Sequence, residues 1–177
     1  MKAIIYQSST GHTQRYAQQL AADMGIPAYE VLEARKYLNR GEPVIFMGWI
    51  RGRDLMGYGF FVKRYDVRAI CVVGAAPSGE QALEKVTRHY HIKNLPLFYL
   101  QGGVASGKVR GSDRKILDML KDDLAKKATR RKKKGLPPCE HEDALLGVLV
   151  RGGDYVCQEN LSEIMDWVET QTENSHC

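Results

Sequence analysis

The sequence has few cysteines and no long apolar run. Its four cysteines, Cys71, Cys139, Cys157 and Cys177, form no Cys-x-x-Cys pair and are widely spaced along 177 residues. This spacing is not that of a disulfide scaffold, so we expect free thiols in a reducing compartment. No apolar stretch approaches the roughly 18 residues that cross a bilayer, and the apolar start of the chain is broken too early for a signal peptide. These absences predict a cytoplasmic protein that is not transmembrane.

Metal and nucleotide motifs are also missing. The possible metal ligands Cys139, His141, Cys157, His176 and Cys177 are irregularly spaced, so we expect no zinc site. The chain contains neither Gly-x-Gly-x-x-Gly nor Gly-x-x-x-x-Gly-Lys-Ser/Thr, which excludes the two commonest nucleotide-binding loops. No acid–base pair or nucleophile stands out, and we predict no catalytic residue.

Excess positive charge is confined to one segment, Lys126–Lys134. The net charge is +5, but without the seven cations of this segment 19 basic residues face 21 acidic ones. A near-neutral body argues against a protein whose whole surface grips nucleic acid. The segment is either a solvated helix end or a one-sided field that docks an acidic partner or an anionic membrane surface.

Strand-like and helical patterns alternate along the chain. Short apolar runs predict strands near residues 2–6, 28–32, 44–48, 69–74 and 95–101. Apolar residues at helical spacing predict helices near 13–24, 55–65, 79–90, 112–127 and 161–170. The strands are apolar on both faces, which is typical of a parallel sheet covered by helices on both sides. The sequence therefore predicts a doubly wound α/β fold with a five-stranded parallel sheet.

Composition divides the chain into three parts. Residues 1–128 carry the alternating pattern of the α/β domain. The sequence TRRKKKGLPP, residues 129–138, is basic and contains glycine and proline, so we expect a hinge there. Residues 139–177 then form a helical extension packed on the same domain.

A small-residue loop follows the first expected strand and has the chemistry of a phosphate site. It consists of Ser8, Ser9, Thr10, Gly11, His12 and Thr13. In an open parallel sheet, ligands bind beyond the carboxyl ends of the strands. Hydroxyl groups can donate to a phosphate there, and amides that open a helix direct its dipole at the anion. The alternative is a polar turn that merely caps the helix.

This loop resembles the FMN-phosphate loop of flavodoxins in its hydroxyl-x-Thr-Gly-x-Thr pattern. The resemblance implies an FMN cofactor and a sheet of strand order 2-1-3-4-5. It also implies that two further loops enclose the flavin ring, of which the first contributes Trp49, Ile50 and Arg51, with Trp49 stacking on the ring. The second loop contributes Gly74, Ala75, Ala76, Pro77, Ser78 and Gly79.

The second loop departs from the family because it lacks the tyrosine that flavodoxins commonly place there. The resemblance therefore implies one flavin face that is open to a substrate or quinone. A further likeness is to the flavodoxin-like oxidoreductases, through the segment 102–112. These features predict an FMN protein acting in electron transfer or as a small oxidoreductase. The alternatives are a cofactor-free scaffold of this fold and a module that docks through its basic segment.

Overall fold

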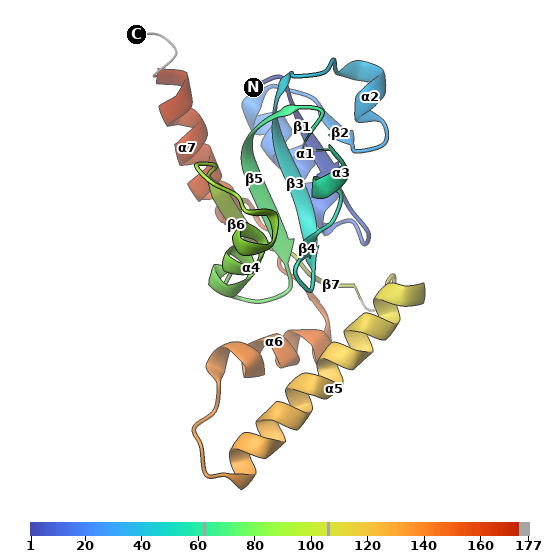
Figure 1. The fold of residues 1–177 in the computed structure, drawn as a ribbon, viewed down its shortest axis with the longest axis vertical. Helices are drawn as coiled ribbons and strands as arrows, with labels where there is room; N and C mark the ends of the chain where they lie inside the picture. The colour runs from blue at the N-terminus through green and yellow to red at the C-terminus, as the bar shows by residue number, and fades with distance from the viewer. Residues whose placement is uncertain (62, 106, 174–177) are drawn as a thin grey trace.

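A mostly parallel β-sheet flanked by helices forms the body of the protein (Figure 1). The computed structural model describes residues 1–61, 63–105 and 107–173. The main path of the sheet consists of β2 (Ala28–Glu30), β1 (Ala3–Gln7), β3 (Pro43–Arg51), β5 (Asp66–Gly74) and β6 (Leu97–Gln101), in that spatial order. All neighbouring strands on this path are parallel. The expected α/β class with a mostly parallel sheet is thus confirmed.

Helices cover both faces of this sheet. On one face, α1 (His12–Met24) and α7 (Ser162–Glu173) bury Tyr16, Leu20 and Ile164 against strand residues such as Ile45. On the other face lie α2 (Ala34–Tyr37), α3 (Tyr58–Phe61) and α4 (Glu80–Tyr90). The strands are apolar on both faces because each face packs against its own helical layer.

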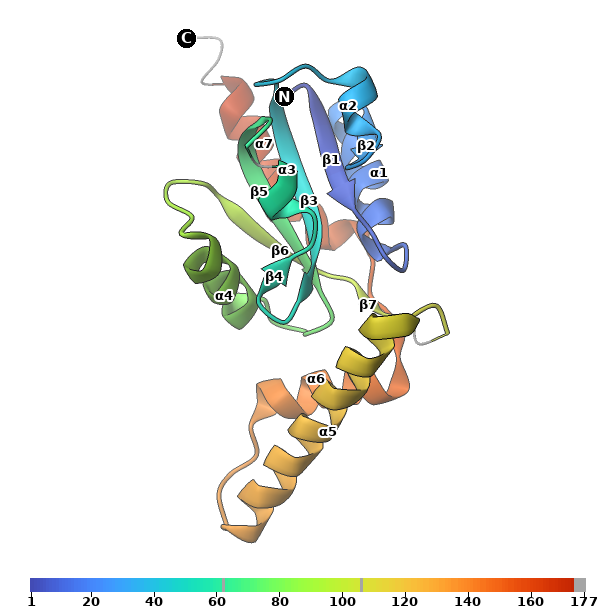
Figure 2. The same cartoon turned by 45° about the vertical axis from the view of Figure 1, so that its right-hand side comes forward.

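A helical hairpin interrupts the chain between the last strand of the sheet and α7. It consists of α5 (Gly111–Lys133), α6 (Glu140–Arg151) and the turn between them. Its base is a short antiparallel pair, β7 (Gly103–Val104) with β8 (Gly153–Asp154). Figures 1 and 2 show the hairpin extending away from the sheet, at the end where β5 and β6 finish. The chain then returns through a short 3-10 turn (Gln158–Leu161) to α7.

The hairpin has a small apolar core of its own. Val104, Leu124, Val148 and Leu149 are buried together, and Ala75 from the body packs against them. Leu161 and Ile164, in contrast, are fully buried in the core of the sheet. The hairpin is therefore an insertion, and the last helix belongs structurally to the sheet body.

The structure differs from the sequence predictions in several segments. The helix expected at 55–65 is too long, because β4 (Asp54–Leu55) turns back antiparallel on β3 and, among the described residues of this range, Tyr58–Phe61 alone form a helix, α3. The hinge expected at 129–138 is wrong for its first half, since α5 continues through Lys133. The boundary expected at residue 128, between the α/β domain and the hinge, falls inside α5. The hairpin begins before this boundary, and α7, which follows the hairpin, packs on the sheet.

Candidate functional site

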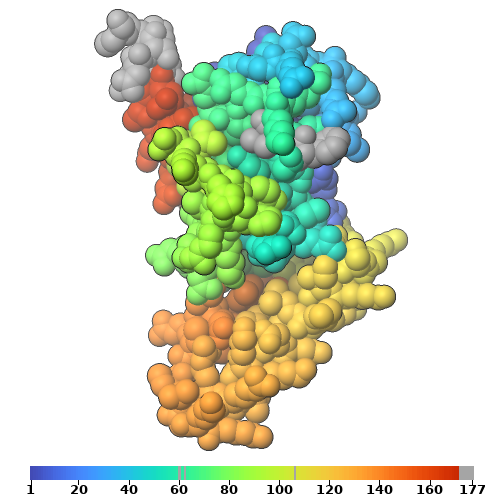
Figure 3. Space-filling model, viewed as in Figure 1, coloured from blue at the N-terminus to red at the C-terminus, as the bar shows by residue number. Residues whose placement is uncertain are grey.

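A cleft of about 290 Å³ lies between the carboxyl edge of the sheet and the helical hairpin. Its walls come from the segments that follow β1, end β3 and follow β5, and from the inner face of the hairpin. Figure 3 shows the hairpin, in yellow and orange, abutting this end of the body. Three segments far apart in the sequence thus meet at one edge, as expected for a parallel sheet.

The loop after β1 is braced from within. The Gly11 amide donates to Ser8 Oγ at 3.1 Å, and Thr10 Oγ1 lies 2.9 Å from His12 Nδ1. Gly11 has φ of 101°, a left-handed conformation that favours glycine at this turn. Ser9, Thr10, His12 and Thr13 line the cleft. Ser8 does not line it and holds the loop shape instead, while Gly11 lines a neighbouring cavity.

His12 connects this loop to the base of the hairpin. Its side chain is buried, with Nε2 3.9 Å from Asp154 Oδ1 on β8. Burial lowers the pKa of His12, although the Asp154 carboxylate acts in the opposite direction. Asp154 also pairs with Arg15 of α1. The first loop and the hairpin base are therefore held in one arrangement.

The second segment is strand rather than loop. Trp49, Ile50 and Arg51 were expected on a loop, but β3 continues through Arg51 and pairs with β4. Half-buried Trp49 and Ile50 both line the cleft. Arg51 also lines it, and its Nη2 donates to Ser112 Oγ at 3.2 Å and pairs with Asp113 Oδ1 at 3.1 Å. Arg51 thus ties the end of β3 to the first turn of α5.

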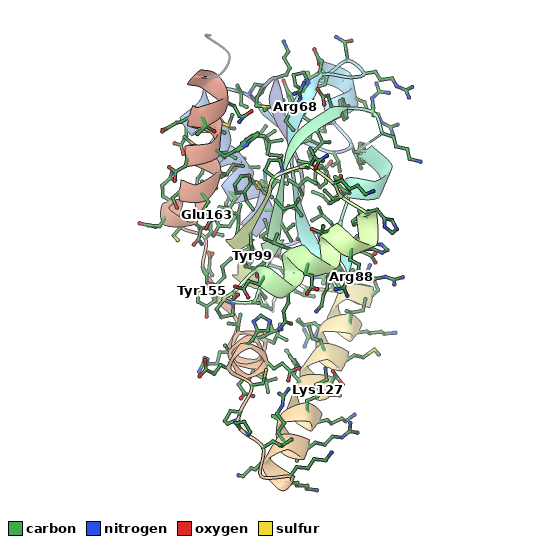
Figure 4. All side chains as sticks on the ribbon, turned by 60° about the vertical axis from the view of Figure 1, so that its left-hand side comes forward. Arg68, Arg88, Tyr99, Lys127, Tyr155 and Glu163 are labelled. Carbon is green, nitrogen blue, oxygen red and sulfur yellow. The ribbon has the colours of Figure 1, made fainter. Side chains whose placement is uncertain are left out.

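The third segment, Gly74–Gly79, rests on an aromatic side chain from the next strand. Tyr99 of β6 donates its hydroxyl to the Ala76 carbonyl at 2.7 Å. A Cβ at Gly79 would lie 2.1 Å from Tyr99 Cγ, so this position requires glycine. Burial raises the pKa of Tyr99. Figure 4 shows Tyr99 on the part of the body that faces the hairpin. The loop itself has no aromatic residue, and β6 provides one behind it.

Four of the six residues predicted from this third loop line the cleft. They are Gly74, Ala75, Ala76 and Ser78, whereas Pro77 and Gly79 are not part of the lining. Most of the 15 predicted site residues therefore line the cleft, and each of the three segments contributes some of them. Tyr99, which sequence reasoning missed, also lines the cleft. Its only sequence signal was its place near the end of an expected strand.

The hairpin wall was missed entirely by sequence reasoning. It presents five apolar side chains to the cleft, namely Ile116, Leu117, Leu120, Leu145 and Leu149, and Val109 just before α5 adds a sixth. His141 and Asp113 are the polar members of this wall, and Lys85 of α4 adds a cation from the body. The helical spacing of Ile116, Leu117 and Leu120 is visible in the sequence. Nothing in that spacing indicates which surface the helix faces.

The cysteines and the possible metal ligands form no site that the structure describes. Cys71 is fully buried in β5, and burial raises the pKa of its thiol. Within residues 1–61, 63–105 and 107–173, no group of three histidine, cysteine or acidic side chains is arranged to hold a metal ion. His176 and Cys177 lie outside the described residues. In the same part of the chain, no helix has the length and apolar content needed to span a membrane.

No protein-family model, curated protein or solved structure matches this chain. The cleft therefore has to be interpreted from its own residues. It combines a hydroxyl-rich loop at a helix start, an indole at a strand end and a small-residue loop supported by Tyr99, with an apolar wall opposite them.

Proposed function

We propose that this protein binds FMN in the cleft and acts in electron transfer or as a small flavin-dependent oxidoreductase. In this proposal the five parallel strands form a doubly wound, flavodoxin-like sheet of order 2-1-3-4-5. The observation that carries the proposal is the meeting of three segments at the carboxyl edge of the sheet. They are the segments expected, from the flavodoxin resemblance, to contact the phosphate and the two sides of the flavin ring.

The loop Ser8–Thr13 would hold the phosphate. Thr10 and Thr13 line the cleft, and α1 begins at His12, so the unpaired amides of its first turn lie at the end of this loop. A helix start favours an anion through its unpaired amides and its dipole. Lys108 lines the neighbouring cavity with Thr10 and Gly11 and would supply positive charge near the loop, which has no lysine of its own. Arg15 lines it too, but it pairs with Asp154.

The ring would lie between the end of β3 and the loop after β5. Trp49 and Ile50 offer apolar surface on one side, and the small residues Gly74–Ala76 allow close approach on the other. FMN would supply the redox chemistry, while the protein would orient it and adjust its potential. The hairpin wall covers the remaining side, which favours a small reactant in the cleft over direct docking of a large protein partner.

Absorption spectroscopy of the purified protein tests this proposal. We expect flavin bands in the visible range, and quenching of FMN fluorescence when the cofactor-free protein is titrated with FMN. Riboflavin, which lacks the phosphate, is the matched control and should bind more weakly. A colourless protein that leaves FMN fluorescence unchanged would contradict cofactor binding. Equal affinity for riboflavin would contradict the phosphate role of the loop.

Trp49 gives a second test. If its indole stacks on the flavin, its fluorescence should be strongly quenched in the FMN-bound protein and recover when FMN is removed. Trp167 lies on α7, with its ring centroid 6.0 Å from that of Phe98, and should respond much less. Measuring Trp49→Phe and Trp167→Phe side by side separates the two signals. Similar changes in Trp49→Phe and in the parent protein would show that Trp49 only packs.

A further inference from the structure

The far end of the helical hairpin carries unpaired positive charge. We call residues 126–138, the last turns of α5 and the turn that follows, the basic tip. Lys127 and Arg131 face α6, where both pair with Glu142, and Lys127 also pairs with Asp123. Five exposed cations of the tip form no ion pair with any residue that the structure describes, namely Lys126, Arg130, Lys132, Lys133 and Lys134.

The spacing of three of these cations directs them away from α6. Lys126, Arg130 and Lys133 are separated by four and three residues, so they share one helix face. Because the rest of the chain has slightly more acidic than basic side chains, the field of the tip is one-sided. An anionic surface would attract the tip and would not attract the body. The molecule would therefore approach such a surface tip first.

An apolar side chain is exposed among these charges. α5 ends in a Schellman-type turn, in which Gly135 N donates to Lys132 O and Leu136 N donates to Arg131 O. In such a turn the residue at position 136 commonly packs back on the helix. Leu136 instead remains 53% exposed, and Pro137 and Pro138 beside it are also exposed. Figure 1 shows this turn at the end of the hairpin remote from the sheet.

We propose that the basic tip docks on anionic lipid bilayers, with lysine and arginine side chains at the headgroups and Leu136 inserted beside them. Clustered cations with a neighbouring apolar side chain bind such surfaces through charge attraction and apolar burial. The segment 111–151 contains no tryptophan, tyrosine or phenylalanine. Protein interfaces are enriched in aromatic residues and depleted in lysine, so the tip does not have the composition of a protein-docking site.

Nucleic acid fits the tip less well than lipid. Duplex phosphates would attract the cations, but they offer no apolar surface for Leu136. Single strands are usually held by aromatic stacking, which this segment does not provide. Leu136 therefore distinguishes the two partners, since only a bilayer buries its side chain.

Vesicle co-sedimentation of the full chain tests the proposal. The probes are vesicles of equal parts phosphatidylserine and phosphatidylcholine, and vesicles of phosphatidylcholine alone. We expect binding to the anionic vesicles only, and loss of binding when salt is raised from about 0.05 M to about 0.5 M. Each cation near an anionic surface strengthens binding roughly fivefold. Replacing Arg130, Lys132, Lys133 and Lys134 by serine should therefore weaken it by about a hundredfold or more.

Two further variants make the result specific. The quadruple serine variant at Lys2, Arg40, Lys63 and Lys93 removes the same charge from exposed positions outside the hairpin and should bind nearly as the parent does. Leu136→Ser should weaken vesicle binding roughly tenfold, as expected for losing a buried leucine side chain. Circular dichroism checks that each variant is folded.

Three outcomes would overturn the proposal. They are equal binding to both kinds of vesicle, equal losses in the two quadruple variants, and binding to duplex DNA but not to vesicles. Vesicle binding by Leu136→Ser that equals that of the parent, together with strong DNA binding, would also overturn the proposal and would point to phosphate recognition instead. None of these measurements uses FMN, so lipid docking can fail or succeed independently of the proposed cofactor.

Discussion

Replacing both Thr10 and Thr13 by alanine is expected to weaken FMN binding by about a hundredfold or more. Each hydroxyl would donate to a charged phosphate, and such a hydrogen bond contributes roughly 1.5–3 kcal/mol. Since about 1.4 kcal/mol corresponds to a tenfold change in affinity, the two losses together reach this size. Both threonines line the cleft, Thr10 on the loop before α1 and Thr13 in the first turn of α1. The measurement is a fluorescence titration of the cofactor-free proteins with FMN.

A matched variant separates binding from general damage. Thr87 and Thr129 lie on α4 and α5 and do not line the cleft, so replacing both by alanine should leave FMN affinity unchanged. Riboflavin affinity should change little in either double variant, because riboflavin has no phosphate. Thermal unfolding of the cofactor-free proteins shows whether the loop substitutions alter folding. An unchanged FMN dissociation constant in the folded Thr10/Thr13 variant would remove the loop from the proposed site.

Leu161→Ala is expected to lower the free energy of unfolding by about 2–5 kcal/mol, the usual range for a leucine deleted from a packed core. Leu161 ends the 3-10 turn that leads into α7 and is fully buried in the core on one face of the sheet, in the same cluster as Tyr16 and Leu20. The cavity that remains cannot be filled easily, because the strands behind it are fixed on both faces. Urea unfolding followed by circular dichroism measures the change.

Leu136→Ala is the matched control for this prediction. It removes the same atoms, but Leu136 is 53% exposed at the basic tip, so the change should stay within about 0.5 kcal/mol. The pair also tests the boundary of the body. If Leu161→Ala were as mild as Leu136→Ala, the 3-10 turn and the α7 that follows it would be an appendage and not part of the sheet layer.

The segment 55–65 shows why local pattern was insufficient there. Leu55, Tyr58, Phe61 and Tyr65 recur at helical spacing and are all buried, so the pattern identified the core residues correctly. It placed the start of the helix too early, because Leu55 pairs with Ile50 in an antiparallel turn and a glycine at 57 with φ of 86° separates it from α3. Spacing reports which side chains are buried, whereas the backbone path depends on pairing with β3.

The hairpin shows a different limit. The sequence 129–138 is charged and contains glycine and proline, yet α5 continues through Lys133. Glu142 of α6 pairs with Lys127 and Arg131 and so relieves repulsion within the run, and Leu124 packs on Val148. Contacts with a helix further along the chain therefore decide how far α5 extends.

The sequence by itself determined the alternation of strands and helices and the mostly parallel sheet, and it predicted the three segments that the structure brings to one cleft. These follow from apolar periodicity and from the rule that loops after parallel strands share one edge. Only the tertiary structure decided that Tyr99 supports the loop after β5, that Arg51 joins β3 to α5, and that an apolar hairpin wall closes the cleft. The physical reason is that these contacts join residues distant in the sequence, and local patterns specify which side chains are buried but not which partner buries them.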